Sequence, residues 1–86
     1  MPELCRFYGI IIRMFFRDHN PPHFHAVYQG EKACFAILTL ELLEGNLPKR
    51  ARLLVTEWAI EHREELLVNW EKCQRDGTVI PIDPLR

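Results

Sequence analysis

The fold is decided by residues 6–17, RFYGIIIRMFFR, together with the pentapeptide DHNPP that follows at residues 18–22. The first stretch is rich in β-branched and aromatic side chains, which favour a β-strand. The two prolines end this strand, because proline cannot donate a hydrogen bond to a sheet ladder and restricts the residue before it. We therefore predict a strand over about residues 6–17, followed by a turn or a short extended connection.

The residues after the two prolines predict two further strands, over 23–28 and 32–38. Gln29-Gly30-Glu31 forms a tight connection between them, so hairpin geometry makes the three strands an antiparallel meander. Residues 40–44 either extend the third strand or start a helical turn before Gly45, and the sequence leaves both possibilities open.

The C-terminal half predicts one long helix over about residues 47–76. Asn46 supplies a capping side chain ahead of Pro48, and Asp76-Gly77 supplies a stop signal. At ~1.5 Å per residue such a helix exceeds about 40 Å, so its far end should project beyond a small sheet or meet a partner. The prediction is an α+β fold, in which an antiparallel sheet of about three strands is followed by one long C-terminal helix, with residues 1–86 as a single domain.

The predicted helix has two apolar sides. At 100° per residue one broad stripe faces the core, and it contains Ala51, Val55, Trp58, Ala59, His62, Leu66, Trp70 and Cys73. On nearly the opposite side Leu53, Ile60 and Leu67 recur every seven residues. We interpret this second ridge as a homodimer contact; the alternative is three scattered exposed aliphatic side chains, which are normal on a soluble protein.

Composition limits the classes of function. A chain of 86 residues buries only about 60–65% of its unfolded surface, so self-association would add to a thin core. The formal net charge of −1 provides no global basic field, and any nucleic-acid contact must use a local patch.

Three widely separated cysteines (Cys5, Cys34 and Cys73) suggest neither a disulfide framework nor a cysteine zinc site, which fits a reducing cytoplasm. No signal core or membrane-spanning run is apparent, so no membrane partner is expected.

Histidines provide the strongest functional signal. Three of the four lie in the heptapeptide HNPPHFH at residues 19–25. Strand side chains alternate, so His23 and His25 should share a face with their Cα atoms about 6.6–7 Å apart. Arg13 and Arg17 have the parity opposite to the aliphatic side chains of the first strand. We therefore expect a solvent-facing patch of His19, His23, His25, Arg13 and Arg17 on the side of the sheet away from the helix.

The first interpretation of this patch is RNA binding, with or without cleavage. Arg13 and Arg17 would hold phosphate, His23 and His25 would act as acid and base at the ribose 2′-hydroxyl and the leaving oxygen, and His19 would orient them. Such chemistry needs no cofactor.

The second interpretation is a divalent-metal site formed by His19, His23 and His25, since neutral imidazole is the commonest metal ligand. The preceding loop could deliver Asp18 to the histidine pair in place of His19. The two arginines oppose such a site unless they bind an anionic substrate.

The third interpretation is structural, with the histidines bonding backbone groups beside the prolines while the helix binds a protein partner. The sequence does not choose among the three, and it leaves open whether any catalysis occurs.

The chain also resembles the bacterial domain of unknown function 4160 family. The resemblance runs through RFYGI (6–10), Arg13-Met14, DHNPPHFHA (18–26), LELLEG (40–45), Leu47-Pro48, Glu57-Trp58 and Asn69-Trp70. It implies a compact sheet-plus-helix domain in small bacterial cytoplasmic proteins, often paired genetically with another small protein, as in toxin–antitoxin modules. It implies no established activity and no catalytic residues. Together with the histidine–arginine face, it favours a toxin–antitoxin-type module with RNA and a small cognate protein as partners.

Overall fold

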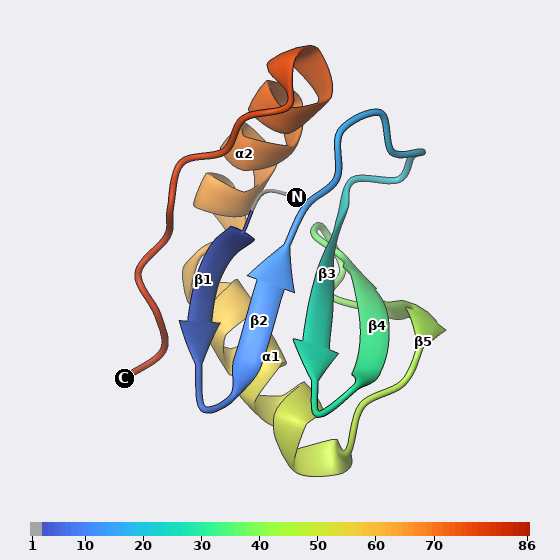
Figure 1. The fold of residues 1–86 in the computed structure, drawn as a ribbon, viewed down its shortest axis with the longest axis vertical. Helices are drawn as coiled ribbons and strands as arrows, with labels where there is room; N and C mark the ends of the chain where they lie inside the picture. The colour runs from blue at the N-terminus through green and yellow to red at the C-terminus, as the bar shows by residue number, and fades with distance from the viewer. Residues whose placement is uncertain (1–2) are drawn as a thin grey trace.

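The computed structural model describes residues 3–86 as a five-stranded antiparallel sheet with two helices on one side (Figure 1). The strands follow chain order, and each pairs with the next: β1 (Glu3–Phe7), β2 (Ile10–Arg13), β3 (His23–Tyr28), β4 (Glu31–Ala36) and β5 (Leu42–Gly45). The predicted α+β class and antiparallel meander are confirmed, whereas the predicted number of strands is wrong.

The single strand predicted over residues 6–17 is wrong because the run contains a hairpin. Tyr8 and Gly9 connect β1 to β2, with φ angles of 49° and 81°. Positive φ at both central residues belongs to a type I′ turn, which glycine adopts without strain. The alternation expected within the run is confirmed for Ile10, Ile12 and Met14, which are buried, but β2 ends at Arg13 and Phe16 lies exposed in a turn.

The strand predicted over residues 23–28 is confirmed as β3, and the third predicted strand is present as β4, which ends two residues before 38. The ambiguous segment 40–44 forms the edge strand β5. β5 ends at Gly45, whose φ is +74° and where a Cβ would lie 2.1 Å from the Lys32 carbonyl oxygen. Glycine is therefore the residue that this approach of β5 to β4 requires.

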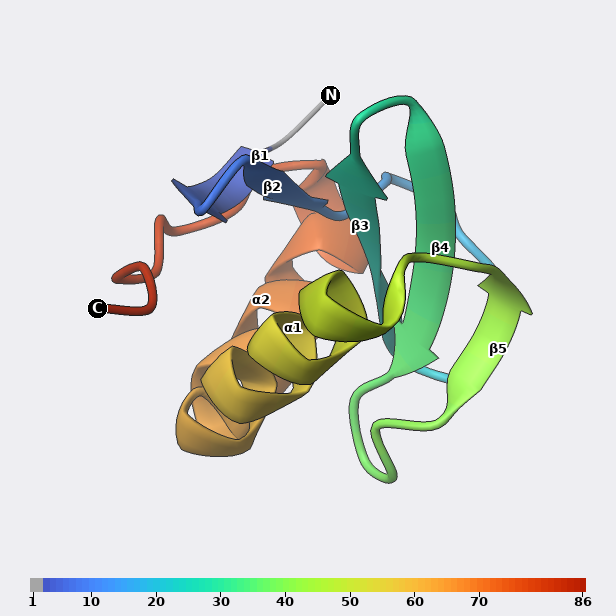
Figure 2. The ribbon, with the colours of Figure 1, turned by 90° about the horizontal axis from the view of Figure 1, so that it is seen from below.

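The long helix predicted over residues 47–76 is wrong, because the chain forms α1 (Lys49–Glu61) and α2 (Arg63–Asp76) with a break at His62. An unbroken helix would be about 45 Å long, whereas the largest dimension of the Cα trace is 33 Å. At the break, the His62 amide donates to the Ala59 carbonyl three residues back. Figure 2 shows both helices on the concave side of the sheet.

The two predicted helix faces differ in outcome. Every member of the core stripe is buried except His62, which is partly exposed, packs against Trp58 and bonds Glu65. On the other side Leu53 and Ile60 are 60% and 58% exposed, but Leu67 is half-buried and packs against the core. The seven-residue ridge is therefore reduced to two side chains on α1.

The C-terminal segment after α2 runs beside β1 (Figure 1), where the Ile82 amide donates to the Leu4 carbonyl. The Trp58 indole donates to the Asp83 carbonyl at 2.8 Å and anchors the segment to α1. No helix among the described residues is long and apolar enough to cross a bilayer.

Candidate functional site: a histidine, aspartate and cysteine cluster

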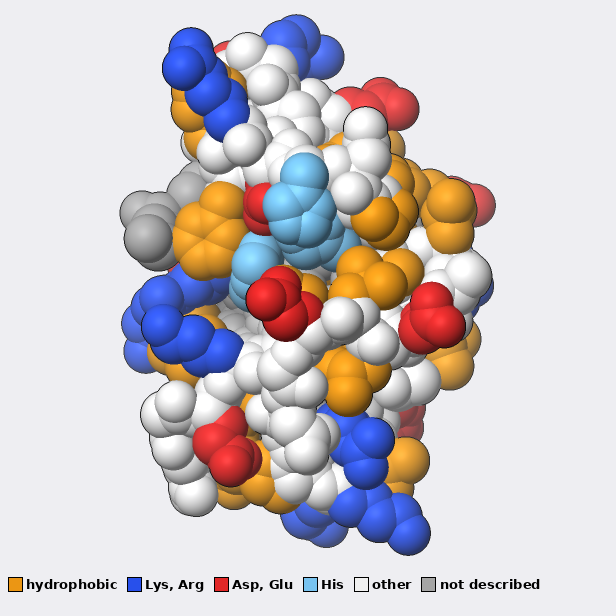
Figure 3. Space-filling model, turned by 90° about the vertical axis from the view of Figure 1, so that its right-hand side faces the viewer, with side chains coloured by type: hydrophobic (Ala, Val, Ile, Leu, Met, Phe, Trp, Pro, Cys, Tyr) orange, Lys and Arg blue, Asp and Glu red, His pale blue; other side chains and the backbone are white. Residues whose placement is uncertain are grey.

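The site lies where the 14–22 connection meets the start of β3. His23 and His25 project from β3 with their ring centroids 5.1 Å apart, and the His19 ring stacks on His23 at 5.0 Å. The convergence of the three imidazoles predicted from their spacing is confirmed, and Figure 3 shows the histidines gathered on one face of the molecule beside carboxylate side chains.

Asp18 is the centre of the cluster. One carboxylate oxygen, Oδ2, lies 2.9 Å from Nε2 of His23 and 3.0 Å from Nε2 of His25, while Oδ1 accepts the His19 amide at 2.9 Å. The loop was expected to bring either His19 or Asp18 to the histidine pair, and in the structure the Asp18 carboxylate joins the two imidazoles. Its signal was present, since Asp18 directly precedes the histidine heptapeptide.

Gln74 of α2 holds this carboxylate in place. Its Oε1 accepts the Asp18 amide at 2.8 Å, and its Nε2 donates to the Phe15 carbonyl at 2.9 Å. The two bonds tie both sides of the turn to a helix more than fifty residues away in sequence. Sequence reasoning missed Gln74, although it lies one helical turn after buried Trp70 and therefore on a side of α2 that can reach the sheet.

His23 was predicted to face solvent, and this prediction is wrong, because its side chain is only 1% exposed. Its ring packs between His19 and Trp70 of α2, whose ring centroid is 5.1 Å away. Both of its nitrogens are engaged, because Nδ1 lies 2.7 Å from the Pro21 carbonyl oxygen and Nε2 faces Asp18. The Asn20–Pro21 peptide beside it is cis.

His25 is more open, with 23% of its side chain exposed. The Phe15 ring meets it edge-on at 4.3 Å, and the Cys34 sulfur on β4 lies 3.0 Å from its Nδ1. Cys34 stands directly opposite His25 in the β3–β4 register. The connection predicted over residues 29–31 would have placed Phe35 opposite His25, whereas β4 begins at Glu31, which pairs with Tyr28. The pair of His25 and Cys34 therefore did not follow from the predicted strand bounds.

The two arginines have separate positions. Arg13 stands opposite His25 in the β2–β3 register, so it shares the imidazole's face of the sheet, as predicted. Arg17 lies in a turn after β2 with φ 59°, and its guanidinium carbon is 5.0 Å from the centre of the Phe16 ring. Its predicted place on the same strand as Arg13 is wrong, because β2 ends at Arg13.

Charge and burial set the protonation of the cluster. Burial raises the pKa of Asp18, but hydrogen bonds from His25 and from the His19 amide, with the nearby imidazole charges, outweigh it and leave the pKa below its usual value. Burial is also the main cause that lowers the pKa of His25. Burial, helped by the negative charges of Glu44 and Asp18, raises the pKa of Cys34 to about 11. The resting cluster thus contains a carboxylate, a neutral His25 and a protonated thiol.

These side chains form two sets of donor atoms that could hold a metal ion. Within each set the atoms lie within 4.8 Å of one another; one set is His23, His25 and Cys34, and the other is Asp18, His19 and His23. The set predicted from the sequence, His19, His23 and His25, contributes members to both. A cavity of about 320 Å³ opens beside the cluster, lined by His25, Lys32, Ala33, Cys34, Glu44 and Gly45.

The comparisons with known proteins agree with the resemblance seen in the sequence. A family model described as "Domain of unknown function (DUF4160)" matches residues 9–71. Neither the curated proteins nor the solved structures yield a match. The matched region contains the whole cluster and ends just before Gln74. Since the match covers well over half of the sequence, the chain belongs to the domain of unknown function 4160 family.

Proposed function

We propose that the chain is a metal-binding domain that holds one divalent ion between Asp18, His23 and His25, with His19 at the solvent side. The observation that carries this proposal is the contact between Asp18 and the buried His23. A carbonyl oxygen can only accept, so the 2.7 Å contact with Pro21 makes Nδ1 of His23 the protonated nitrogen. In neutral His23, Nε2 then presents a lone pair to a carboxylate oxygen 2.9 Å away.

Two facing acceptors need a cation between them. A proton can fill this role, but it places a charged imidazolium on a side chain that is 1% exposed, which is costly even when paired. A divalent ion satisfies both groups and leaves the imidazole neutral. Histidine ligands of metals commonly donate their second ring N–H to a backbone carbonyl, as His23 does to Pro21.

The neighbouring histidines fit the same arrangement. His25 has a lowered pKa and directs Nε2 to the same carboxylate oxygen. His19 is 76% exposed, and its Nε2 lies 3.7 Å from the other oxygen of Asp18. An exposed side chain can turn towards the ion at little cost, so His19 would complete the coordination from the solvent side.

The test is metal analysis of protein purified without a histidine tag. We expect about one zinc or similar ion per chain, its loss to a chelator, and a higher unfolding temperature when the ion is restored. The double variant His23→Gln/His25→Gln should lose the ion, while His62→Gln, outside the cluster, should keep it. Absence of both bound metal and a metal-dependent thermal shift in the wild type would refute the proposal.

A second proposal is the RNA-binding, toxin–antitoxin-type function, and Arg13 supports it. Arg13 stands opposite the partly exposed His25 in the β2–β3 register, and its guanidinium could bind a phosphate on the same face of the sheet as this imidazole. Burial of His23 leaves exposed His19 as the better partner for acid–base exchange with His25. Wild type and Arg13→Ala/His25→Ala should differ in RNA binding and cleavage, and equal behaviour would contradict this function.

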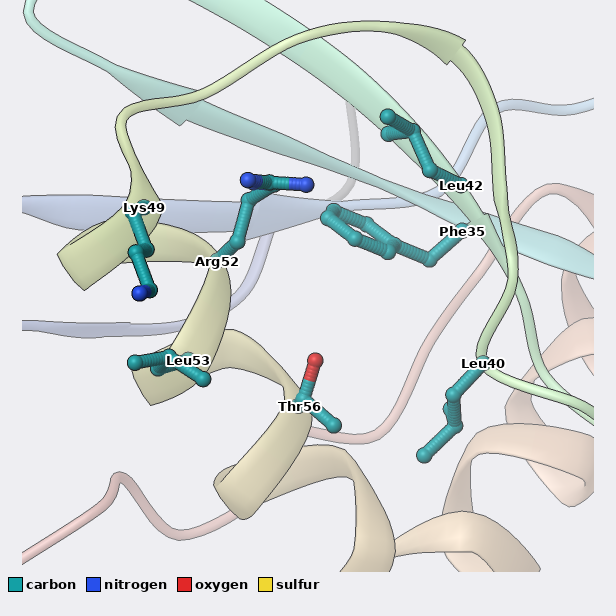
Figure 4. Close-up of a pocket in the computed structure, with 7 residues that line it drawn as sticks. All are labelled: Phe35, Leu40, Leu42, Lys49, Arg52, Leu53 and Thr56. Atoms are coloured by element: carbon teal, nitrogen blue, oxygen red, sulfur yellow. The ribbon is translucent and has the colours of Figure 1, made fainter.

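A third proposal concerns self-association through α1. Leu53 and Ile60 remain exposed on this helix, and a second copy of the chain would cover them. Leu53 also borders a cavity of about 270 Å³ between α1 and the β4–β5 region, where it lies near Lys49, Arg52 and Thr56 with Phe35, Leu40 and Leu42 on the opposite wall (Figure 4). A small cognate protein is the alternative occupant of this surface.

We also propose a cytoplasmic location. Cys5, Cys34 and Cys73 are all free thiols, which suits a reducing compartment.

A further inference from the structure

We infer that Cys34, in place of the exposed His19, is the fourth ligand of the same metal centre, so that the site takes a thiophilic ion of the Zn²⁺ class rather than Mg²⁺ or Ca²⁺. This inference rests on the proposed metal-binding function and deepens it. The inference assigns a role to Cys34, although the spacing of the cysteines along the chain does not predict a metal site.

The geometry places the sulfur within reach of the other donors. Cys34 Sγ lies 3.0 Å from Nδ1 and 3.9 Å from Nε2 of His25, whose Nε2 is in turn 3.0 Å from Asp18 Oδ2. The bond lengths of tetrahedral zinc put neighbouring nitrogen and sulfur ligands about 3.6 Å apart, and neighbouring nitrogen and oxygen ligands about 3.3 Å apart. The two sulfur–nitrogen separations lie on either side of the first value, and the nitrogen–oxygen separations of 2.9 and 3.0 Å lie slightly below the second. Small shifts of the His25 ring, the sulfur and the carboxylate would therefore close a four-ligand site.

The sheet positions the sulfur rigidly. His25 and Cys34 are directly opposed residues of two paired strands, and the register continues on both sides of them from His23 to Tyr28. Directly opposed side chains of an antiparallel pair have Cβ atoms about 4.5–5.5 Å apart, a spacing suited to sharing one ion. A strand pair therefore contributes three donors, and the Asp18 turn held by Gln74 brings the fourth.

The donor set determines the class of metal. Two imidazole nitrogens, one sulfur and one carboxylate oxygen match the ligands of Zn²⁺, whereas Mg²⁺ and Ca²⁺ prefer oxygen ligands throughout. Binding breaks the S–H bond of Cys34, releases its proton to water and forms a sulfur–metal bond, with no change of oxidation state. The ion supplies the positive charge that stabilises the thiolate.

The cavity beside Cys34 provides access. Its lining includes both His25 and Cys34, and Lys32 and Glu44 stand at its wall. An ion can therefore reach the sulfur from solvent without passing the buried His23.

The test uses Co²⁺ as a spectroscopic probe and Zn²⁺ as a competitor, with the full chain. Wild type should show the near-ultraviolet absorption of thiolate-to-cobalt charge transfer, which Zn²⁺ should remove and excess Mg²⁺ should leave unchanged. Cys34→Ser should lose this band and bind Zn²⁺ at least about 100-fold more weakly. Loss of a direct ligand should weaken binding at least as much as loss of an outer-shell partner does. Cys5→Ser, which removes a half-buried thiol outside the cluster, should retain both properties.

The possible failures are distinguishable. If wild type binds Co²⁺ without a thiolate band and Cys34→Ser binds equally well, the inference about Cys34 is overturned while the proposed metal site survives. If wild type binds neither Co²⁺ nor Zn²⁺, the proposed function and this inference fall together. Because the first readout is the spectrum of the wild type, the result does not depend on whether Cys34→Ser folds.

Discussion

The Oδ2 atom of Asp18 lies 2.9 Å from Nε2 of His23, although the other nitrogen of that ring already contacts the Pro21 carbonyl. The buried imidazole is therefore held between two acceptors. This relationship distinguishes His23 from His25, whose Nδ1 faces a thiol that can donate.

Asp18→Asn should separate folding from metal binding. The amide oxygen can accept the His19 amide, and one amide N–H can donate to Nε2 of His23. The second can donate to Nε2 of His25 once that imidazole carries its proton on Nδ1, where the Cys34 sulfur can accept it, so the contacts of the ion-free cluster are kept. We expect the free energy of unfolding without metal to change by about 1 kcal/mol or less. Metal affinity should fall at least about tenfold, because the anionic ligand is lost.

Chemical denaturation and metal titration of this variant measure the two effects. Asp18→Ala is the control. It should lose metal binding and also about 1–3 kcal/mol of stability, because it leaves Nε2 of the buried His23 without a partner. Asp18→Asn protein that binds Zn²⁺ as tightly as wild type would contradict the role of the carboxylate.

Gln74→Ala should weaken the site, although Gln74 is not one of the proposed metal ligands. The substitution removes the bonds to the Asp18 amide and the Phe15 carbonyl. We expect a loss of about 1–3 kcal/mol in unfolding free energy and about tenfold in metal affinity. Glu71→Ala, at an exposed position of the same helix, should change neither quantity, and an equal effect of both substitutions would argue against Gln74 as a positioning residue.

Gly45→Ala should destabilise the edge of the sheet. Its φ is +74°, and its new methyl group would lie 2.1 Å from the Lys32 carbonyl oxygen, so backbone strain and a collision combine. The strain alone costs about 1–3 kcal/mol. Gly30→Ala is the matched control, because its φ is +83° but no atom lies within 4 Å of the added carbon. Thermal unfolding should therefore show the larger loss for Gly45→Ala, and equal losses would mean that the approach of β5 to Lys32 is not rigid.

Ile60→Glu should abolish self-association if a second copy covers α1. The residue is 58% exposed, so the charge should leave the monomer's fold intact. Light scattering after size-exclusion chromatography measures the oligomeric state. Val68→Glu provides the control on α2, with a similar exposure of 57%, and a dimer that persists in Ile60→Glu would place the contact elsewhere.

The fold was predictable wherever local pattern carried the information. Residues 23–28 were found with their bounds because the prolines precede them and a glycine turn follows. The hairpin at Tyr8-Gly9 was missed because the apolar run continues through the turn. The break at His62 was missed because the pattern of buried side chains continues across it, from Trp58 to Leu66.

The candidate site shows the same division. Alternation along a strand placed His23 and His25 together, and it also placed Arg13 on the face that His25 occupies. Arg17 was misplaced because the parity of a strand has no meaning beyond the residue where the strand ends. Burial of His23 could not be predicted, since it depends on Trp70 from the other end of the chain.

By itself, the sequence determined the class of the fold, the inward parity of the strands and the meeting of the histidines, because these follow from the geometry of neighbouring residues. Only the tertiary structure decided that Asp18 joins the imidazoles, that Gln74 holds the turn and that Cys34 stands beside His25. The physical reason is that such contacts depend on strand register and on a helix packed from more than fifty residues away.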